Sequence, residues 1–444
     1  MNRAGIPPVP QPRAPGDGAG RRRRRRDGAS ITVTHLRTFA ALEAVLADWQ
    51  SLFRSAGRDN PFAAPEWLLP WARHFVAEPE LDVCAVWRDG TLVGLAPWYV
   101  KEGPLLPRRL QLLGSGRHAP LTELPQVLTA PGEARSVLRA VIGEWTREPD
   151  EWGWLELPMT ADQGWFEPEW LAGTAAEGCL VQHKTTRASV VLDLPAGVAE
   201  LHAGLKRNLL EATHRARNRL GKAGQPWAIT AHEDPCGVVG ALPALTRLHA
   251  ARARLAGRKI HPDHLAAAAR RLFLNDALVA MAARGQARIL TLDVAGKPVA
   301  AQLVLSAPEG SYLSLSGLDP QWWNVSPVTL LQLHAAQDAV ERGHSVFNLS
   351  VGPSVSKLRW SEQIRQHPEF VVCGPRQSSR LAFTAYRMAA AAAAVHREAQ
   401  RHRSRRADRG PAPGSGSPHP AGKEATTHWT AERKETARAH PGAD

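Results

Sequence analysis

Two stretches of the chain alternate apolar and polar positions around a glycine-containing turn. Leu81 to Val100 carries alternating apolar residues on both sides of Asp89-Gly90, a dipeptide typical of tight hairpins. Arg288 to Ser306 repeats this design around Ala295-Gly296-Lys297. The pattern therefore predicts one β-hairpin in each half of the chain.

The two predicted hairpins also resemble each other in sequence. The stretch from Gly90 to Ala96 runs parallel to the stretch from Gly296 to Gln302, and each continues into an apolar strand. A spacing of about 200 residues is far longer than the repeats of solenoid proteins. We therefore expect a duplicated domain, with lobes over residues 31–190 and 195–375; two unrelated hairpins are the alternative.

Helical periodicity precedes the hairpin in each half. Phe39 to Arg54 places apolar residues at three-to-four spacing, and Val198 to Leu220 does so more weakly, with a strongly basic face. Pro65 is typical of a first helical position. Short β-like and helical runs alternate throughout the body, so we expect an α/β or α+β fold with mixed sheets flanked by helices.

The net charge of +13 is concentrated at the two ends of the chain. Residues 1–30 and 376–444 carry the whole excess, and residues 31–375 are formally neutral. This distribution excludes a basic recognition surface built from a charge surplus across the folded body, although a local patch stays possible. We expect a disordered Arg-rich tail over 1–30, and an Ala-rich basic helix over 380–406 that leads into a disordered tail.

We expect the two basic tails to be solvated; the alternative is that they bind RNA, DNA or anionic lipid. No segment has the composition of a signal peptide or the length of a membrane span. The cysteines are four and widely spaced, without a CxxC pair, which disfavours a zinc or redox site. We expect a cytoplasmic, reduced protein that holds no metal.

A helix start in the second half offers a site for an anion. Ser326 fits an N-cap, Pro327 fits the first helical position, and Gly343 fits the stop at the other end. The first N–H groups of a helix lack partners and its dipole is positive there, so this terminus can hold a phosphate or pyrophosphate. Nearly every α/β protein has such helix ends, so the feature alone is not specific.

The order of four segments in the second half is more specific than any one motif. They are Leu248-His249 with Arg252 and Gly257, the hairpin 296–300, the helix start Ser326-Pro327, and the strand 347–349 leading to residues 357–360. This order resembles the CelD-like, or cellulose-biosynthesis-type, acetyltransferase family, a branch of the GNAT superfamily related to the FemAB-type aminoacyltransferases. The resemblance covers residues 195–375, and residues 35–190 more loosely as the first half of a tandem GNAT arrangement.

The resemblance implies a mixed sheet whose splayed strands admit the pantetheine arm of acetyl-CoA or another acyl-CoA. The pyrophosphate would lie at the helix start, on Ser326, Pro327, Val328, Thr329 and Leu330. The acyl group would pass directly to an amine or hydroxyl of a small-molecule or polysaccharide-precursor acceptor. Two positions depart from the family: Val328 stands where glycine is usual, and Ser356 where an aromatic residue is usual.

Four side chains are candidates for the chemistry of transfer. His249 is the candidate general base, because an imidazole titrates near neutral pH. Arg252 lies on the same helical face and could hold an anionic acceptor or steady His249. Asn348 could orient the thioester carbonyl, and Lys357 could contact the cofactor phosphates or the acceptor. Residues 261–264 contain two histidines but no third ligand, and we interpret them as a helix start.

Several enzyme classes are excluded by missing motifs. Gly114-Ser115-Gly116 lacks the outer spacing of a GxSxG nucleophile elbow, and the chain has neither a P-loop nor a GxGxxG fingerprint. Two alternatives to an acyl-CoA enzyme remain. One is a FemAB-like aminoacyltransferase that uses charged tRNA, which the basic helix 205–222 would suit; the other is a non-catalytic acyl-CoA-binding module.

Overall fold

The computed structural model of the protein describes residues 30–103, 106–116, 121–147, 153–158, 178–255 and 261–407. Residues up to Tyr386 form one compact unit, and a second unit begins at Arg387. The Ala-rich helix is confirmed as α12 (Gln377–Ala407). The remaining predictions for the two tails, and the role given to Gly257, lie outside the described residues. Among the described helices, none has the length and apolar character needed to cross a lipid bilayer.

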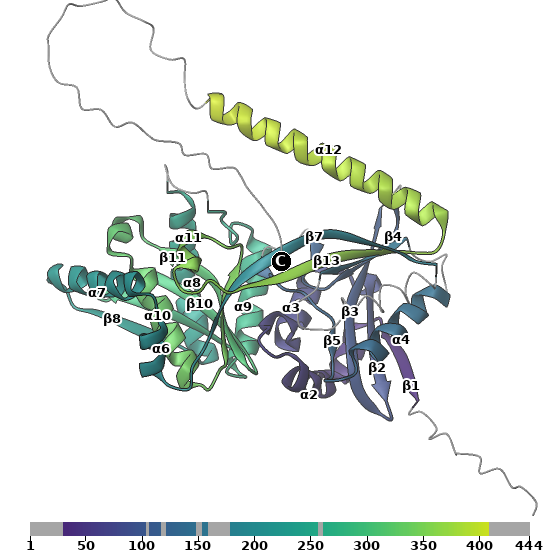
Figure 1. Cartoon of the computed structure of the whole chain (residues 1–444), viewed down its shortest axis with the longest axis horizontal. Helices are drawn as coiled ribbons and strands as arrows, with labels where there is room; N and C mark the ends of the chain where they lie inside the picture. Colours follow the sequence, from purple (N-terminus) through teal and green to yellow (C-terminus); the bar gives the residue numbers. More distant parts are fainter. Residues whose placement is uncertain are drawn as a thin grey trace, which may run out of the picture. The chain divides into compact units, whose positions relative to one another are not determined.

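A single mixed sheet of thirteen strands runs through the first unit (Figure 1). Its order is β1-β2-β3-β4-β6-β13-β7-β12-β11-β10-β9-β8, and β5 pairs with β3 off this path. The strands are β1 (Ile31–Leu36), β2 (Leu81–Arg88), β3 (Thr91–Gly103), β4 (Leu106–Leu112), β5 (Leu128–Thr129), β6 (Trp154–Pro158), β7 (Leu180–Asp193), β8 (Trp227–His232), β9 (Ala287–Val294), β10 (Lys297–Ala307), β11 (Gly310–Leu318), β12 (Val346–Val351) and β13 (Ile364–Cys373). The predicted fold class, a mixed sheet flanked by helices, is confirmed.

Helices cover both faces of the sheet. They are α1 (Phe39–Ala44), α2 (Leu46–Ala56), α3 (Pro65–Phe75), α4 (Ala134–Arg147), α6 (Val198–Gly204), α7 (Arg207–Lys222), α8 (Pro235–Ala253), α9 (Ala268–Ala282), α10 (Pro327–Glu341) and α11 (Val355–Leu358), with 3-10 turns η1 (Pro61–Ala63), η2 (Glu78–Glu80) and η4 (Pro320–Val325). One apolar core joins α2 and α3 to α8 and α9, where the rings of Trp67 and Phe273 lie 5.0 Å apart. A second core packs α6, α7 and α10 against strands of the second half, and a third packs α4 against strands of the first half.

The same strand arrangement occurs twice. Strands β1 to β4 form an antiparallel meander whose last strand lies parallel to β6, and β8 to β11 form a second meander whose last strand lies parallel to β12. Both predicted hairpins are confirmed. Each turns through two residues with positive φ and then bulges at the third residue of the next strand, at Val93 and at Val299. This shared irregularity supports a duplicated architecture beyond the similarity of sequence.

The last strands of the two halves cross over to join the sheet. β13, which follows the second half, pairs with β6 of the first, and β7, which follows the first half, pairs with β12 of the second. β7 and β13 also pair with each other, from Leu180 opposite Cys373 to Val190 opposite Ile364, and they lie side by side along their length in Figure 1. The lobe boundaries at 190 and 195 stay a prediction, and strand pairing crosses them.

Three helix predictions differ from the structure in detail. The stretch from Phe39 to Arg54 forms two helices, α1 and α2, separated at Val45, and the stretch from Val198 divides into α6 and α7 at Leu205 and Lys206. The predicted start at Pro65 is confirmed. Residues 261–264 do not begin a helix, because the next helix, α9, starts only at Ala268.

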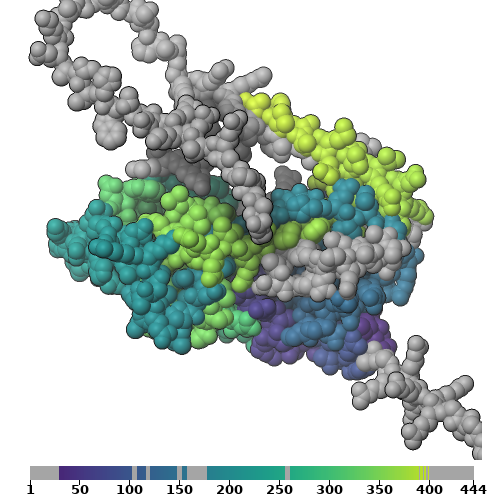
Figure 2. Space-filling model, in the orientation of Figure 1, coloured from purple at the N-terminus to yellow at the C-terminus, as the bar shows by residue number. Residues whose placement is uncertain are grey.

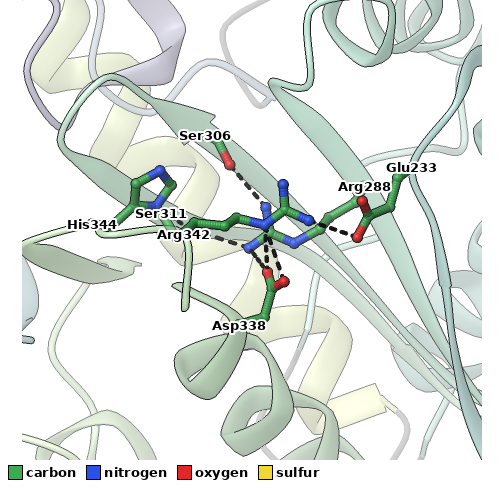
Figure 3. A network of polar contacts seen from close by, with 7 residues as sticks. All are labelled: Glu233, Arg288, Ser306, Ser311, Asp338, Arg342 and His344. Carbon is green, nitrogen blue, oxygen red and sulfur yellow. Dashed lines mark hydrogen bonds and ion pairs between the residues drawn. The ribbon is translucent and has the colours of Figure 1, made fainter. Parts of the chain in front are cut away.

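A buried arginine fixes the C-terminal end of α10 to the sheet. Arg288 on β9 is 2% exposed, and burial lowers its pKa to about 10. Its guanidinium lies 2.6 Å from Asp338 and donates to Ser306. Figure 3 shows the guanidinium of Arg342 converging on the same carboxylate. A buried charge without such partners would be strongly destabilising, so the network holds α10 at one position on the sheet.

Gly317 on β11 packs directly on the backbone of α8. A Cβ atom at this position would lie 2.6 Å from the Cβ of Leu248 and 2.7 Å from the backbone nitrogen of His249. The strand and the helix are therefore closer than any other residue permits.

We predict that Gly317→Ala lowers the free energy of unfolding by about 2 kcal/mol, because backbone atoms cannot move aside as a flexible side chain would. Gly240→Ala on α8 is the control, since a Cβ at that position meets no atom within 4 Å. That control should be stabilising by about 0.5 to 1 kcal/mol. Urea unfolding of both variants measures the difference, and an equal effect of the two substitutions would contradict the close packing.

His344 provides a second prediction, on pH. Burial and the charges of Arg288 and Arg342 lower its pKa to about 4, and its Nδ1 lies 2.9 Å from the hydroxyl of Ser311. Between pH about 6.5 and about 4, His344 is protonated in the unfolded chain but neutral in the folded protein. The free energy of unfolding is therefore unaffected by this group above that pH range and decreases as the pH falls through it. His344→Asn should lose stability less steeply than the wild type between pH 7 and 4.5 in urea unfolding. Parallel profiles would show that His344 does not titrate differently on folding.

Candidate functional site in the second half

The parallel strands β11 and β12 part after three residue pairs. Gly310, Ser311 and Tyr312 pair with Val346, Phe347 and Asn348, and the pairing stops there although β11 continues to Leu318. On β12 the backbone turns at Ser350, whose φ of 71° is unusual for a residue other than glycine. The strands thus diverge where Tyr312 and Asn348 face each other, as the resemblance predicted.

A carboxylate from the first half reaches this point of divergence. Glu123 accepts a hydrogen bond from the hydroxyl of Tyr312 and another, at 2.9 Å, from the backbone N–H of Val351. Burial raises the pKa of Glu123, and these two hydrogen bonds act in the opposite direction. Burial also raises the pKa of Tyr312 well above its usual value, which keeps the phenol protonated at neutral pH.

Asn348 and Lys357, which the sequence singled out, both support the turn in β12. The buried side chain of Asn348 accepts a hydrogen bond from the backbone N–H of Ser350 at 2.9 Å. The ammonium of Lys357 donates to the hydroxyl of Ser350 at 2.9 Å and to the backbone oxygens of Ser350 and Val351. These three contacts engage the three donors of Lys357, so the geometry gives both residues a positioning role.

His249 and Arg252 lie on α8, where this helix contacts β11 at Ser316. His249 is fully buried; its Nδ1 lies 2.9 Å from the backbone oxygen of Ser316, and its Nε2 accepts the backbone N–H of His264. Arg252 donates to the hydroxyl of Ser316. Both ring nitrogens of His249 are thus occupied, and this geometry does not support the predicted general-base role.

The predicted phosphate site is a helix start without a side-chain cap. Ser326 precedes α10 with φ of 61°, and its side chain makes no capping hydrogen bond, contrary to the predicted N-cap interaction. Pro327 occupies the first helical position, as predicted. The side chain of Val328 packs against the core shared with α7 and α10, whereas Thr329 and Leu330 complete the first turn. The valine side chain at position 328, where the family usually has glycine, therefore lies on the face of α10 that packs against the core.

Sequence reasoning missed Glu123 and Tyr312. Tyr312 lies on a strand that was recognised, but an isolated tyrosine carries no signal of its own. Glu123 comes from a loop of the first half, 189 residues before Tyr312, and only the folded structure brings the two together.

One further group of potential metal ligands occurs in the described part of the chain. His35, Asp82 and Cys84 place their ligand atoms within 4.8 Å of one another. His35 already lies 2.5 Å from Asp82, and the guanidinium of Arg37 contacts the same carboxylate oxygen at 3.4 Å. A cation beside Arg37 would be repelled, so we assign no metal function to this group.

Comparison with known proteins supports the fold and the second-half domain. Residues 207–358 match the family model of an acetyltransferase (GNAT) domain. No curated protein matches the chain. The chain is similar to the crystal structure of FemX, with a TM-score of 0.54, 11% identity, and coverage of 77% of this chain and 96% of that chain. At this identity the likeness concerns the fold alone.

Two more distant structures are also similar. A tandem GNAT protein from the clavulanic acid biosynthesis pathway has a TM-score of 0.40 and 14% identity, over 78% of this chain and 99% of that chain. L-PGS from Bacillus licheniformis has a TM-score of 0.42 and 11% identity, over 76% of this chain and 93% of that chain. Neither score is high enough to add to the argument.

We predict that Glu123→Ala lowers the free energy of unfolding by about 1 to 3 kcal/mol, because it leaves the Tyr312 hydroxyl and the Val351 N–H buried without an acceptor. In a double-mutant cycle with Tyr312→Phe the two losses should be non-additive by at least about 0.5 kcal/mol. The control is Glu309→Ala, whose ion pair with Arg58 is exposed and contributes little. Additive losses in urea unfolding would mean that Glu123 and Tyr312 do not interact.

Proposed function

We propose that the second half transfers an acetyl or other acyl group from acyl-CoA to an amine or hydroxyl acceptor. The observation that carries this proposal is the divergence of β11 and β12 ahead of the uncapped start of α10. All three elements lie inside the region that matches a GNAT domain. The finer assignment to the CelD-like branch rests on the order of sequence segments alone.

In this proposal the pantetheine arm lies along the edge of β11 from Leu313 to Leu318, where pairing with β12 has ended. Backbone groups along that edge can hydrogen-bond an extended amide chain as a partner strand would. The pyrophosphate lies at Ser326 to Leu330, where the first N–H groups and the helix dipole favour an anion.

The transfer itself needs a proton acceptor and a proton donor. The acceptor nucleophile attacks the thioester carbonyl, its bond to the acyl carbon forms, the C–S bond breaks, and the nucleophile loses a proton. Glu123, which Tyr312 and Val351 hold at the divergence of the strands and whose pKa burial raises, is our candidate for taking that proton, and the departing thiolate takes up a proton from solvent. Asn348 and Lys357 hold the β12 turn beside them.

The exposed basic face of α7 supports a phosphate-rich donor. Arg215, Arg217 and Arg219 are exposed on this helix, which forms the teal surface at the left margin of Figure 2. Arg219 donates to the backbone oxygen of Asn324 in η4, directly before the proposed pyrophosphate site. The same face would suit charged tRNA, which is the alternative donor, so the test must separate the two.

We predict that the full chain binds coenzyme A and acetyl-CoA saturably in calorimetric titration, and that Ser326→Trp abolishes this binding. A tryptophan places bulk at the helix start and disfavours the positive φ of this position. Ser326→Gly is the matched control, because glycine adopts that φ without strain and retains the backbone N–H, so it should bind as the wild type does.

Three results would contradict the proposal. Folded protein that binds no coenzyme A, but binds tRNA with an affinity that falls steeply with salt, would favour the charged-tRNA donor. Coenzyme A binding that is unchanged in Ser326→Trp would place the cofactor elsewhere. Binding of acetyl-CoA without turnover of any amine or hydroxyl acceptor would favour the non-catalytic module.

A further inference from the structure

The first half contains an opening at the position that corresponds to the divergence of β11 and β12. β4 and β6 pair in parallel at two positions only, Arg109 opposite Trp154 and Leu110 opposite Leu155, and then separate. A cavity of about 610 Å³ is lined by residues on both strands at this point, among them Arg109, Gln111 and Glu156. The repeated topology therefore places a second opening in the sheet, outside the matched GNAT region.

The wall of this cavity is polar and charged. The Gly114-Ser115-Gly116 loop forms one side, and it approaches so closely that a Cβ on Gly116 would lie 2.7 Å from the Tyr99 hydroxyl. Tyr99 in turn donates to Gln111 at 3.0 Å. A wall of this kind suits a hydrophilic ligand and not an acyl chain.

Most of the charges in the wall neutralise one another. Lys101 pairs with Glu80 at 3.0 Å, Lys184 pairs with Glu156 at 2.8 Å, and Arg187 pairs with Glu369 at 2.5 Å. Glu156 and Glu369 are buried, at 8% and 5% exposure, so each of these carboxylates needs its cation and is not available to a ligand.

Arg109 differs from these paired cations. Its guanidinium carbon lies over the ring of Tyr386, 5.3 Å from the centroid, and no carboxylate of the described residues forms an ion pair with it. Its Nε is buried and has no hydrogen-bond partner within the part of the chain that the structure describes. The contact with Tyr386 and the buried Nε hold a cation that no described carboxylate neutralises at the wall of a polar cavity.

We propose that this cavity binds a small hydrophilic molecule through one anionic group, a carboxylate or a phosphate, held by Arg109. A planar guanidinium matches either group in a two-point hydrogen bond, and a hydrogen bond between two charged groups is stronger than one between neutral groups. The hydroxyl oxygen of Tyr99, which lines the cavity and donates its proton to Gln111, can accept a hydrogen bond from the uncharged part of the ligand.

The cavity shares a wall with the site of the second half. Thr122 and Pro125 line the cavity, while Glu123, between them in sequence, binds Tyr312 and Val351. A bound ligand therefore rests against the segment that carries Glu123. The binding proposal does not depend on the acyl transfer proposed above.

The test compares three probes of the same ring, glucose, glucuronate and glucose 6-phosphate, in calorimetric titrations of the full chain. They differ only in the group at C6, which is a hydroxyl, a carboxylate or a phosphate. We expect at least one anionic probe to bind saturably with one site and about tenfold more tightly than glucose, and the better of the two identifies the preferred anion.

Arg109→Met should weaken that binding about tenfold or more, because it keeps the stacking volume and removes the charge. Arg139→Met removes an exposed arginine of α4 and should leave the affinity unchanged. Arg109→Lys, which restores charge without the planar fork, should recover part of the affinity, and thermal melting checks that each variant is folded.

The proposal is overturned if no anionic probe binds, if glucose binds as tightly as the anionic probes, or if Arg109→Met does not change their affinity. Coenzyme A titrations keep the two sites separate. Arg109→Met should bind coenzyme A as the wild type does, and Ser326→Trp should bind the anionic sugar unchanged, so failure at one site is distinguishable from failure at the other.

Discussion

The ladder between β7 and β13 joins the two halves of the protein into one sheet. Each strand follows its own half in sequence but pairs with the other half, β7 with β12 and β13 with β6. The two strands also pair with each other, from Leu180 opposite Cys373 to Val190 opposite Ile364. Neither half can complete its sheet without a strand that follows the other half. The spacing of the two openings in the sheet, and the reach of Glu123 from one half to the other, therefore depend on this ladder.

Local signals in the sequence predicted local structure well. Asp89-Gly90 and Ala295-Gly296 both form two-residue turns with positive φ, because these are the conformations that tight hairpins require. Pro65 and Pro327 begin helices, since a residue without an N–H loses nothing at a first helical position. The periodicity over Phe39 to Arg54 could not show the break at Val45, because the apolar face continues through it.

Contacts between distant segments could not be predicted in the same way. His249 has the residue type of a general base, but it is buried where α8 approaches β11 at Gly317, with its Nδ1 at the backbone oxygen of Ser316. The backbone N–H of His264, which follows α8, engages its Nε2. Asn348 and Lys357 could be singled out because Asn348 lies on a recognised strand and Lys357 follows it closely in sequence, in α11. Glu123 gave no signal, since its partner Tyr312 belongs to the other half and only the folded sheet brings them together.

Hydrogen exchange of the backbone amides can test whether β11 and the start of α10 hold an acyl-CoA donor, as we propose. With coenzyme A present, we expect slower exchange in Leu313 to Leu318 and in the first turn of α10, Val328 to Leu331, while β2, β3 and α4 are unchanged. Protection confined to other elements, or none at concentrations that saturate binding, would contradict this proposal.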